Sequence, residues 1–189
     1  GEISQPKLTV DKEKAQALAK KLGIGQSDKP ILALCPGAAY GPSKRWPAKY
    51  FAQLAKLQRK KGYEIWLLGA KSDIKSCELI NKANDGQLKN FAGKIPLKDS
   101  IALLSLCDTV VCNDSGLMHI SAALEKKVIA IFGSSSPSHT PPLSKDAVVM
   151  DTLDLPCKPC FKRVCPLSGD KHLKCLLDIT PAKVAKSIT

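Results

Sequence analysis

The sequence predicts an α/β fold with a Rossmann-like, doubly wound parallel sheet. Short apolar runs alternate with segments of helical spacing, which is the pattern of repeated strand–helix units. Runs such as Thr109-Val110-Val111 are continuously apolar, as in strands that are buried on both faces. The chain has 189 residues, enough for one good core and an appended element.

Apolar spacing and turn residues define the elements of the first half of the chain. Ala15, Leu18, Ala19 and Leu22 recur at helical spacing, and glycines mark the ends of helices. We expect, in order, a helix over 10–22, a strand over 31–35, a helix over 47–61 that begins at Pro47, a strand over 63–68, and a helix that Ser72 caps and that ends near 84–86.

The second half continues this alternation, without an internal repeat or a long linker. We expect a short strand around Phe91, a helix from an Asp99 cap to Leu106, strands over 109–112, 128–132 and 147–150, a helix over 116–124, a Ser/Pro loop over 133–143, and a last helix from Thr180. Residues 1–28 are expected to form an N-terminal extension with an interdomain helix. Residues 29–189 are expected to form the Rossmann-like domain, with a Cys-rich segment over 157–175.

The most informative stretch, residues 112–119, reads Cys-Asn-Asp-Ser-Gly-Leu-Met-His and joins a strand to a helix. Ligands of open α/β sheets bind at this edge, where a helix start offers free N–H groups to phosphate. Asp114 suits sugar hydroxyls, and the backbone of Ser115, Gly116 and Leu117 suits phosphate. His119 contacts a ligand, orients Asp114, or is an ordinary buried histidine.

A second loop, residues 36–47, is glycine-rich and ends in Lys44 and Arg45 at a helix start. Close backbone approach at glycine and two cations suit a pyrophosphate, and an ordinary surface turn is the alternative. The spacing is neither that of a Walker A loop nor G-x-G-x-x-G.

Two further loops follow strands. Asp73 is either a partner of a helix dipole or an acceptor for ribose hydroxyls. Residues 133–136, Gly-Ser-Ser-Ser, are either turn residues or the last part of the same edge. Four such loops at one edge of a sheet predict a site for a nucleotide-type ligand.

In this order, the loops resemble those of the family 9 glycosyltransferases, and in particular the lipopolysaccharide heptosyltransferases of type II. The resemblance rests on residues 36–47, 113–119, 134–137 and 140–143, and it spans roughly residues 30–189. It implies the C-terminal half of a GT-B enzyme, in which two Rossmann-like domains face a cleft and the C-terminal one holds the nucleotide sugar.

The resemblance also implies roles for individual residues toward ADP-L-glycero-D-manno-heptose. Ala39 and Tyr40 stand where some relatives carry hydroxyl residues, so backbone groups are expected to take more of the phosphate binding. The implied contacts are Lys44 to the diphosphate, Asp73 to the ribose, Asp114 to the heptose hydroxyls, and Ser115, Gly116 and Leu117 to phosphate, with His119 as a further candidate.

For the reaction, the resemblance implies an inverting transfer of heptose that needs no cofactor or metal. The acceptor is then heptosyl-Kdo2-lipid A of the lipopolysaccharide inner core. The general base is an aspartate of an N-terminal half outside this chain, so we expect no catalytic residue and no turnover in this chain alone. The alternatives are a nucleotide-binding module without transferase activity and a GT-B transferase for another nucleotide sugar.

The eight cysteines fall into two groups. Four lie in or beside apolar segments and are expected to be inert core residues: Cys35, Cys77, Cys107 and Cys112. Four are clustered near the C-terminus and are candidates for a structural zinc site, for disulfides or free thiols, or for an iron–sulfur cluster: Cys157, Cys160, Cys165 and Cys175. His172 can replace one of these ligands.

The net charge of +12 has two interpretations, a solvated basic surface or a contact for an anionic partner. With the resemblance, we expect a cytoplasmic protein that docks peripherally on the inner membrane. Aromatic residues make up only 5% of the chain and no recognised motif is present, which argues against nucleic acid. No apolar run approaches the length of a membrane span, and the first residues do not resemble a signal peptide.

Overall fold

The computed structural model describes residues 5–25, 27–152 and 155–188. Within them, parallel strands form a six-stranded sheet in the order β3-β2-β1-β4-β5-β6. This is the strand order of the Rossmann fold, so the predicted fold class is confirmed. The strands are β1 (Ile31–Cys35), β2 (Glu64–Leu67), β3 (Lys89–Asn90), β4 (Thr109–Asn113), β5 (Lys127–Ile131) and β6 (Val148–Met150).

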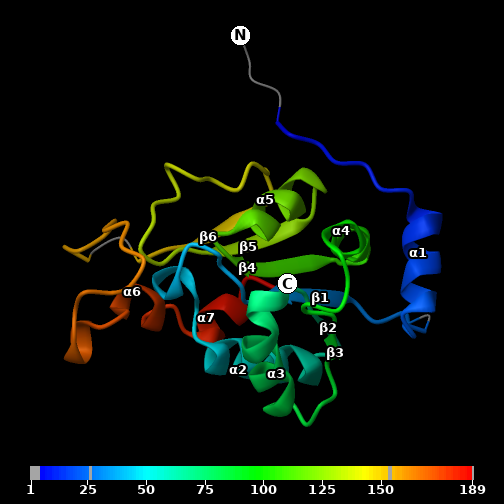
Figure 1. Cartoon of the computed structure of the whole chain (residues 1–189), viewed down its shortest axis with the longest axis horizontal. Helices are drawn as coiled ribbons and strands as arrows, with labels where there is room; N and C mark the ends of the chain where they lie inside the picture. Colours follow the sequence, from blue (N-terminus) through cyan, green and yellow to red (C-terminus); the bar gives the residue numbers. More distant parts are fainter. Residues whose placement is uncertain (1–4, 26, 153–154, 189) are drawn as a thin grey trace.

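Helices cover both faces of the sheet (Figure 1). One face carries α4 and α5, with α1 packed outside α4, and the other carries α2, α3 and α7. The α-helices are α1 (Lys12–Lys21), α2 (Ala48–Lys60), α3 (Ile74–Lys82), α4 (Leu97–Leu106), α5 (Gly116–Ala123), α6 (Lys174–Leu177) and α7 (Pro181–Ala185). No helix of the described residues is long and apolar enough to cross a membrane.

The core has two layers, one on each side of the sheet. Along β1, Leu32 and Leu34 point to the layer that holds Phe51 of α2, whereas Ala33 and Cys35 point to the layer of α4 and α5. Successive strand residues face opposite sides, so a strand covered on both faces needs apolar residues throughout. This explains why the strands appear in the sequence as unbroken apolar runs.

Three helix starts differ from the predictions. Pro47 precedes α2 as an extended N-cap and is not the first helical residue. Ser72 does not cap α3, because a 3-10 turn over Lys71–Asp73 comes first and α3 begins at Ile74. Asp99 lies in the first turn of α4, which begins two residues earlier after Pro96. Polar residues are common both at caps and in first turns, so sequence alone does not separate the two positions.

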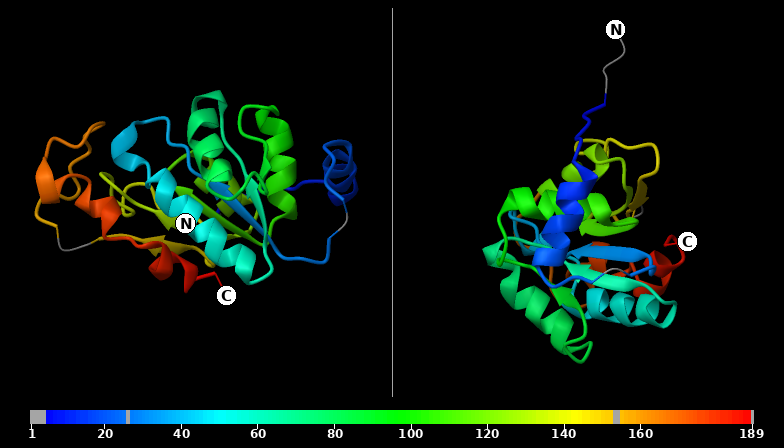
Figure 2. Two further views of the ribbon diagram at one scale, coloured as in Figure 1. Left: turned by 90° about the horizontal axis from the view of Figure 1, so that it is seen from below. Right: turned by 90° about the vertical axis from the view of Figure 1, so that its right-hand side faces the viewer.

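The N-terminal part of the chain runs along the face that carries α5 and then forms α1 at one end of the sheet (Figures 1 and 2). The backbone N–H of Leu8 donates to the carbonyl of Ala123 over 2.7 Å. Ala19 and Ile24 bury their side chains in the layer of α4. The extension therefore packs on the same body, and a domain boundary at residue 28 stays a prediction.

The Cys-rich segment lies at the opposite end of the molecule from α1 (Figure 1). We call residues 155–175 the strap. It is mostly irregular, with a 3-10 turn over Gly169–Lys171 and the start of α6, neither of which the sequence predicted. Lys158 anchors it, since its Nζ donates to the carbonyl of Phe132 over 2.9 Å and pairs with Asp151. Burial lowers the pKa of Lys158 to about 8.

Candidate functional site

The candidate site lies at the carboxyl ends of β1, β4 and β5. Strands β1 and β4 are neighbours in the centre of the sheet, where the strand order reverses, and open α/β sheets bind ligands in the crevice at this point. The loop over residues 36–47 follows β1, residues 114–116 follow β4, and residues 132–136 follow β5. The structure thus brings together these three of the four loops singled out in the sequence, and the fourth, which carries Asp73 after β2, packs against Gly37 of the loop after β1.

Asn113, the last residue of β4, fixes both ends of the loop that follows β1. Its side chain is fully buried. The Oδ1 atom accepts from the backbone N–H of Trp46 over 2.9 Å, and Nδ2 donates to the carbonyl of Pro36 over 2.8 Å. Because buried amide groups without partners are costly, these bonds hold the loop in one shape over the site. Asn113 belongs to the motif over residues 113–119, but the sequence indicated no role for it.

Lys44, Asp114 and Ser135 form a polar cluster that joins the three loops. Lys44 Nζ lies 2.5 Å from Asp114 Oδ2, and Ser135 Oγ donates to the same oxygen over 2.6 Å. The Asp114 side chain is only 4% exposed and that of Lys44 14% exposed, so the pair is well shielded from water. Both partners use Oδ2, which leaves Oδ1 to accept from a ligand hydroxyl.

The start of α5 offers backbone groups beside this cluster. Ser115 is the N-cap of α5 and makes no capping hydrogen bond with its side chain, and Gly116 is exposed. The first N–H groups of a helix have no partner within the helix, and the helix dipole makes them favourable for anions. The backbone at Ser115, Gly116 and Leu117 therefore suits an anion, and its contact with phosphate stays a prediction.

His119 lies in the first turn of α5 and is exposed. The interpretation as a buried histidine is wrong. Asp114 is oriented by Lys44 and Ser135, so it has no need of His119 for that purpose.

Asp73 is buried between the turn after β2 and the loop after β1. Its Oδ2 atom accepts from the N–H of Ala70 over 2.9 Å, and Ser72 Oγ donates to Oδ1 over 3.2 Å. A Cβ atom at position 37 would collide with the carboxylate, so only glycine fits there. Asp73 thus stabilises its own turn, and a contact with ribose stays a prediction.

Ser43 connects the loop after β1 to the loop after β5. Its Oγ lies 3.0 Å from Ser134 Oγ, and its carbonyl accepts from the N–H of Ser134 over 3.1 Å. Both side chains are almost fully buried. Small hydroxyl residues fit such a dry contact between two loops, but serine is so common in surface turns that its presence in the sequence does not predict the contact.

The two groups of cysteines lie in different surroundings. The four expected in the core are buried, and burial raises the pKa of each of them, that of Cys77 to about 12. The strap cysteines are half-buried or exposed and line a cavity of about 60 Å³, together with Ser43 and Ser134: they are Cys157, Cys160, Cys165 and Cys175.

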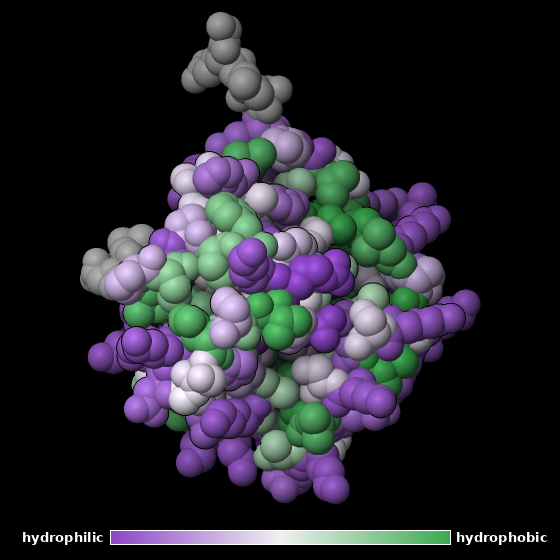
Figure 3. Space-filling model, turned by 60° about the vertical axis from the view of Figure 1, so that its left-hand side comes forward, coloured by the Kyte–Doolittle hydropathy of each residue, from purple (hydrophilic) through white to green (hydrophobic). Residues whose placement is uncertain are grey.

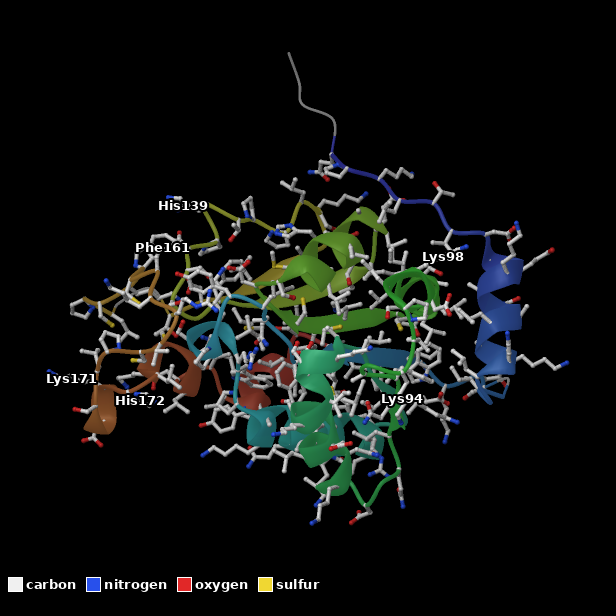
Figure 4. All side chains as sticks on the ribbon, viewed as in Figure 1. Lys94, Lys98, His139, Phe161, Lys171 and His172 are labelled. Atoms are coloured by element: carbon white, nitrogen blue, oxygen red, sulfur yellow. The ribbon has the colours of Figure 1, made fainter. Side chains whose placement is uncertain are left out.

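The chemical state of the strap cysteines stays a prediction. In the structure all eight thiols are free, and among the described residues no group of His, Cys, Asp or Glu is arranged to hold a metal ion. Cys165 Sγ accepts from the N–H of Leu173 over 3.4 Å. The ring of His172 bonds to the carbonyl of Leu167 and lies at the outer end of the strap (Figure 4).

The sheet order and the loop cluster at its switch point define a Rossmann-like α/β domain with an anion-suited site. The sequence profile of glycosyltransferase family 9 (heptosyltransferase) matches residues 2–170. The chain belongs to this family.

Individual relatives agree with the family match. The chain is 37% identical to lipooligosaccharide heptosyltransferase 2 of Haemophilus influenzae, over 95% of this chain and 53% of that protein. It is 33% identical to lipopolysaccharide heptosyltransferase 2 of Salmonella typhimurium, over 97% of this chain and 52% of the relative. The chain thus spans about half the length of the curated relatives it matches.

Solved structures give the same result for the fold. The structure of Escherichia coli ADP-heptose LPS heptosyltransferase II superposes with a TM-score of 0.83 and 32% identity, over 98% of this chain and 54% of the other. A family 9 glycosyltransferase from Veillonella parvula superposes with a TM-score of 0.77 and 26% identity, over 93% of this chain and 49% of the other.

Proposed function

We propose that this chain is the ADP-heptose-binding half of an inverting glycosyltransferase that adds L-glycero-D-manno-heptose to the inner core of lipopolysaccharide. The observation that carries the proposal is the meeting of Lys44, Asp114 and Ser135 beside the open start of α5. The similarity to heptosyltransferases of type 2 supports the choice of sugar and acceptor.

In this proposal the diphosphate lies between Lys44 and the start of α5. The ammonium group of Lys44 and the N–H groups of Ser115, Gly116 and Leu117 face charge that grows on the ADP leaving group during transfer. Fixed donors of this kind stabilise the transition state without having to reorganise. The pairing with Asp114 holds Lys44 in place before the donor arrives, and Ser135 keeps the carboxylate hydrogen-bonded when Lys44 turns to phosphate.

Asp114 is a poor choice for the general base and a good one for binding the sugar. Its carboxylate is already held by an ion pair with Lys44 and a hydrogen bond from Ser135, an arrangement that suits an acceptor of hydrogen bonds better than a group that must take up a proton. In the proposal Oδ1 accepts from heptose hydroxyls, and an acidic residue from the other half of the enzyme activates the acceptor hydroxyl. This chain alone then binds the donor and transfers nothing.

Calorimetric titration of the chain with ADP, UDP and GDP tests the proposal. We expect ADP to bind in preference to the other two. Lys44→Gln should weaken ADP binding by about 30-fold, because a charge-assisted hydrogen bond to phosphate contributes about 2 kcal/mol. Lys49→Gln is the matched control, since Lys49 is an exposed cation on α2 over the ring of Tyr50.

The ribose role of Asp73 is tested in the same titration. Asp73→Asn keeps an oxygen for the N–H of Ala70, and so it should preserve the turn while it weakens ADP binding. Preference for UDP or GDP would favour a transferase for another nucleotide sugar. Tight ADP binding together with a full-length enzyme that transfers no heptose would favour a nucleotide-binding module.

The acceptor is a phosphorylated lipid, so we also propose a cytoplasmic location and peripheral docking on the inner membrane. Figure 3, which brings the side of the strap forward, shows apolar residues between hydrophilic ones on this face. In the strap, Phe161 is 45% and Val164 63% exposed, on either side of two cations. Binding to vesicles of anionic lipid should fall as salt rises; binding that is insensitive to salt contradicts this part.

A further inference from the structure

The strap packs against the loop that carries Lys44. The N–H of Ser43 donates to the carbonyl of Arg163 over 3.2 Å, and Ser43 Oγ donates to the carbonyl of Lys162. The backbone at Arg163 also lies so close to Gly41 that a Cβ there would collide with the Arg163 carbonyl. These contacts fix the backbone of Arg163, in the strap, against the loop that carries Lys44.

Tyr40 places two cations on one aromatic ring. Its hydroxyl donates to the carbonyl of Phe161, which fixes the ring against the strap. Lys44 Nζ lies 5.0 Å from the ring centroid, and the guanidinium carbon of Arg163 lies 5.6 Å from it. Cations are attracted to aromatic faces at this range, so the ring holds both side chains in one neighbourhood despite their mutual repulsion.

The two cations, Lys44 and Arg163, differ in whether an acidic side chain neutralises their charge. Lys44 is paired with Asp114. In residues 5–25, 27–152 and 155–188, Arg163 forms no ion pair with an acidic side chain. Of the two positive charges beside the Tyr40 ring, only that of Lys44 is paired with a carboxylate, which leaves a surplus of positive charge next to the loop that carries Lys44.

We propose that Arg163 is a second phosphate-binding residue of the donor site, supplied by the strap and positioned by Tyr40. This rests on the proposed function, because it assigns a partner to the same diphosphate. A guanidinium group can donate two parallel hydrogen bonds to phosphate oxygens, which an ammonium group cannot. Lys44 and Arg163 then approach the diphosphate from the two loops that meet at Tyr40.

This assignment compensates for the departure at positions 39 and 40. Ala39 has no polar side chain, and the Tyr40 hydroxyl is directed to the Phe161 carbonyl, so neither is placed to donate to phosphate. In the proposal the lost side-chain contacts are replaced by an arginine that lies over 110 residues later in the sequence but beside the loop in the fold.

The test compares two neighbouring cations in calorimetric titrations of the chain with ADP and with adenosine. Arg163→Gln should weaken ADP binding about tenfold and leave adenosine binding unchanged, because only ADP carries the diphosphate. Lys162→Gln removes the same charge from the adjacent, exposed position and should change ADP affinity less than twofold. Arg163→Lys should recover only part of the loss.

The outcomes separate the two proposals. ADP binding that Lys44→Gln weakens and Arg163→Gln does not would overturn the role of Arg163 and leave the proposed function intact. Equal losses from Arg163→Gln and Lys162→Gln would also overturn it, because they would indicate only a general effect of charge. A wild-type chain that does not bind ADP overturns both. Arg163 and Lys162 are exposed, so thermal unfolding should show Arg163→Gln and Lys162→Gln to be as stable as the wild type.

Discussion

The sheet core and the strap carry four cysteines each, and the two sets show how differently these regions are built. In the core, the thiols of Cys35, Cys107 and Cys112 are buried in the layer of α4 and α5, and that of Cys77 is buried in the opposite layer. In the strap, the thiols line a small cavity under irregular backbone. The core is held by the packing of regular elements. The strap is held by a few hydrogen bonds to loops of the candidate site.

The largest effect is expected where the core meets the site. Asn113→Ala removes the partners of the Trp46 N–H and the Pro36 carbonyl, and each buried group left unpaired costs about 1–3 kcal/mol. We expect a loss of about 3 kcal/mol in the free energy of unfolding, measured with urea, and weaker ADP binding. Asn90→Ala at the edge strand β3 is the control and should cost about 1 kcal/mol. If Asn113→Ala and Asn90→Ala lowered the free energy of unfolding equally, the loop over residues 36–47 would be held by other contacts.

Thiol labelling at pH 8 sharpens the comparison directly. The strap cysteines should react quickly with a disulfide reagent. The core cysteines should react only after local or global unfolding exposes them. An opening that costs about 3 kcal/mol slows the reaction about 100-fold. Without an opening, burial holds the pKa of Cys77 at about 12, so the buried thiol is not in the reactive thiolate form at pH 8. Eight thiols that react at one rate would contradict the division.

The same substitution in the two regions gives a smaller effect. Cys112→Ser places a hydroxyl in a fully buried apolar layer and should cost about 2 kcal/mol in urea unfolding. Cys157→Ser, at an exposed position, should stay within about 0.5 kcal/mol. A large loss at Cys157, together with zinc in the purified wild type that the variant lacks, would instead favour a structural zinc site in the strap.

The smallest effect concerns the attachment of the strap. Ser43→Ala removes the hydroxyl that bonds to the Lys162 carbonyl and Ser134 Oγ, which should cost about 1 kcal/mol. Ser138→Ala, in the exposed part of the loop after β5, should cost nearly nothing. A loss confined to Ser43→Ala, measured by thermal unfolding, would show that the strap contributes to stability through this contact.

The regular elements could be predicted because burial on both faces leaves a direct trace in the sequence. The strand over Ile31–Cys35 has the predicted bounds, and β4 extends the predicted strand by one residue, Asn113. Helix starts were less predictable, since Ser72 and Asp99 suit a first turn as well as a cap. The alternation of strands and helices predicted a doubly wound parallel sheet, whereas the order of the strands came from the structure.

The site was predictable only in part. Lys44 and Asp114 were each found from local patterns, but their ion pair joins positions 70 residues apart, and no spacing rule predicts it. Asn113 resembled any polar residue at the end of a strand. Arg163 lies in a segment without periodicity, so only the folded chain brings it to the ring of Tyr40. Contacts made by irregular segments depend on tertiary structure and leave little trace in sequence.

Asn113 makes one hydrogen bond to each end of its neighbouring loop, and this has a practical consequence for enzyme engineering. Because one buried side chain holds both ends of this loop, the backbone at Pro36 and at Trp46 stays at fixed positions when the residues between them change. Residues 38–45 can therefore be exchanged for those of another family 9 transferase while the sheet stays unchanged. Such grafts would test how much this loop contributes to the proposed binding of the diphosphate.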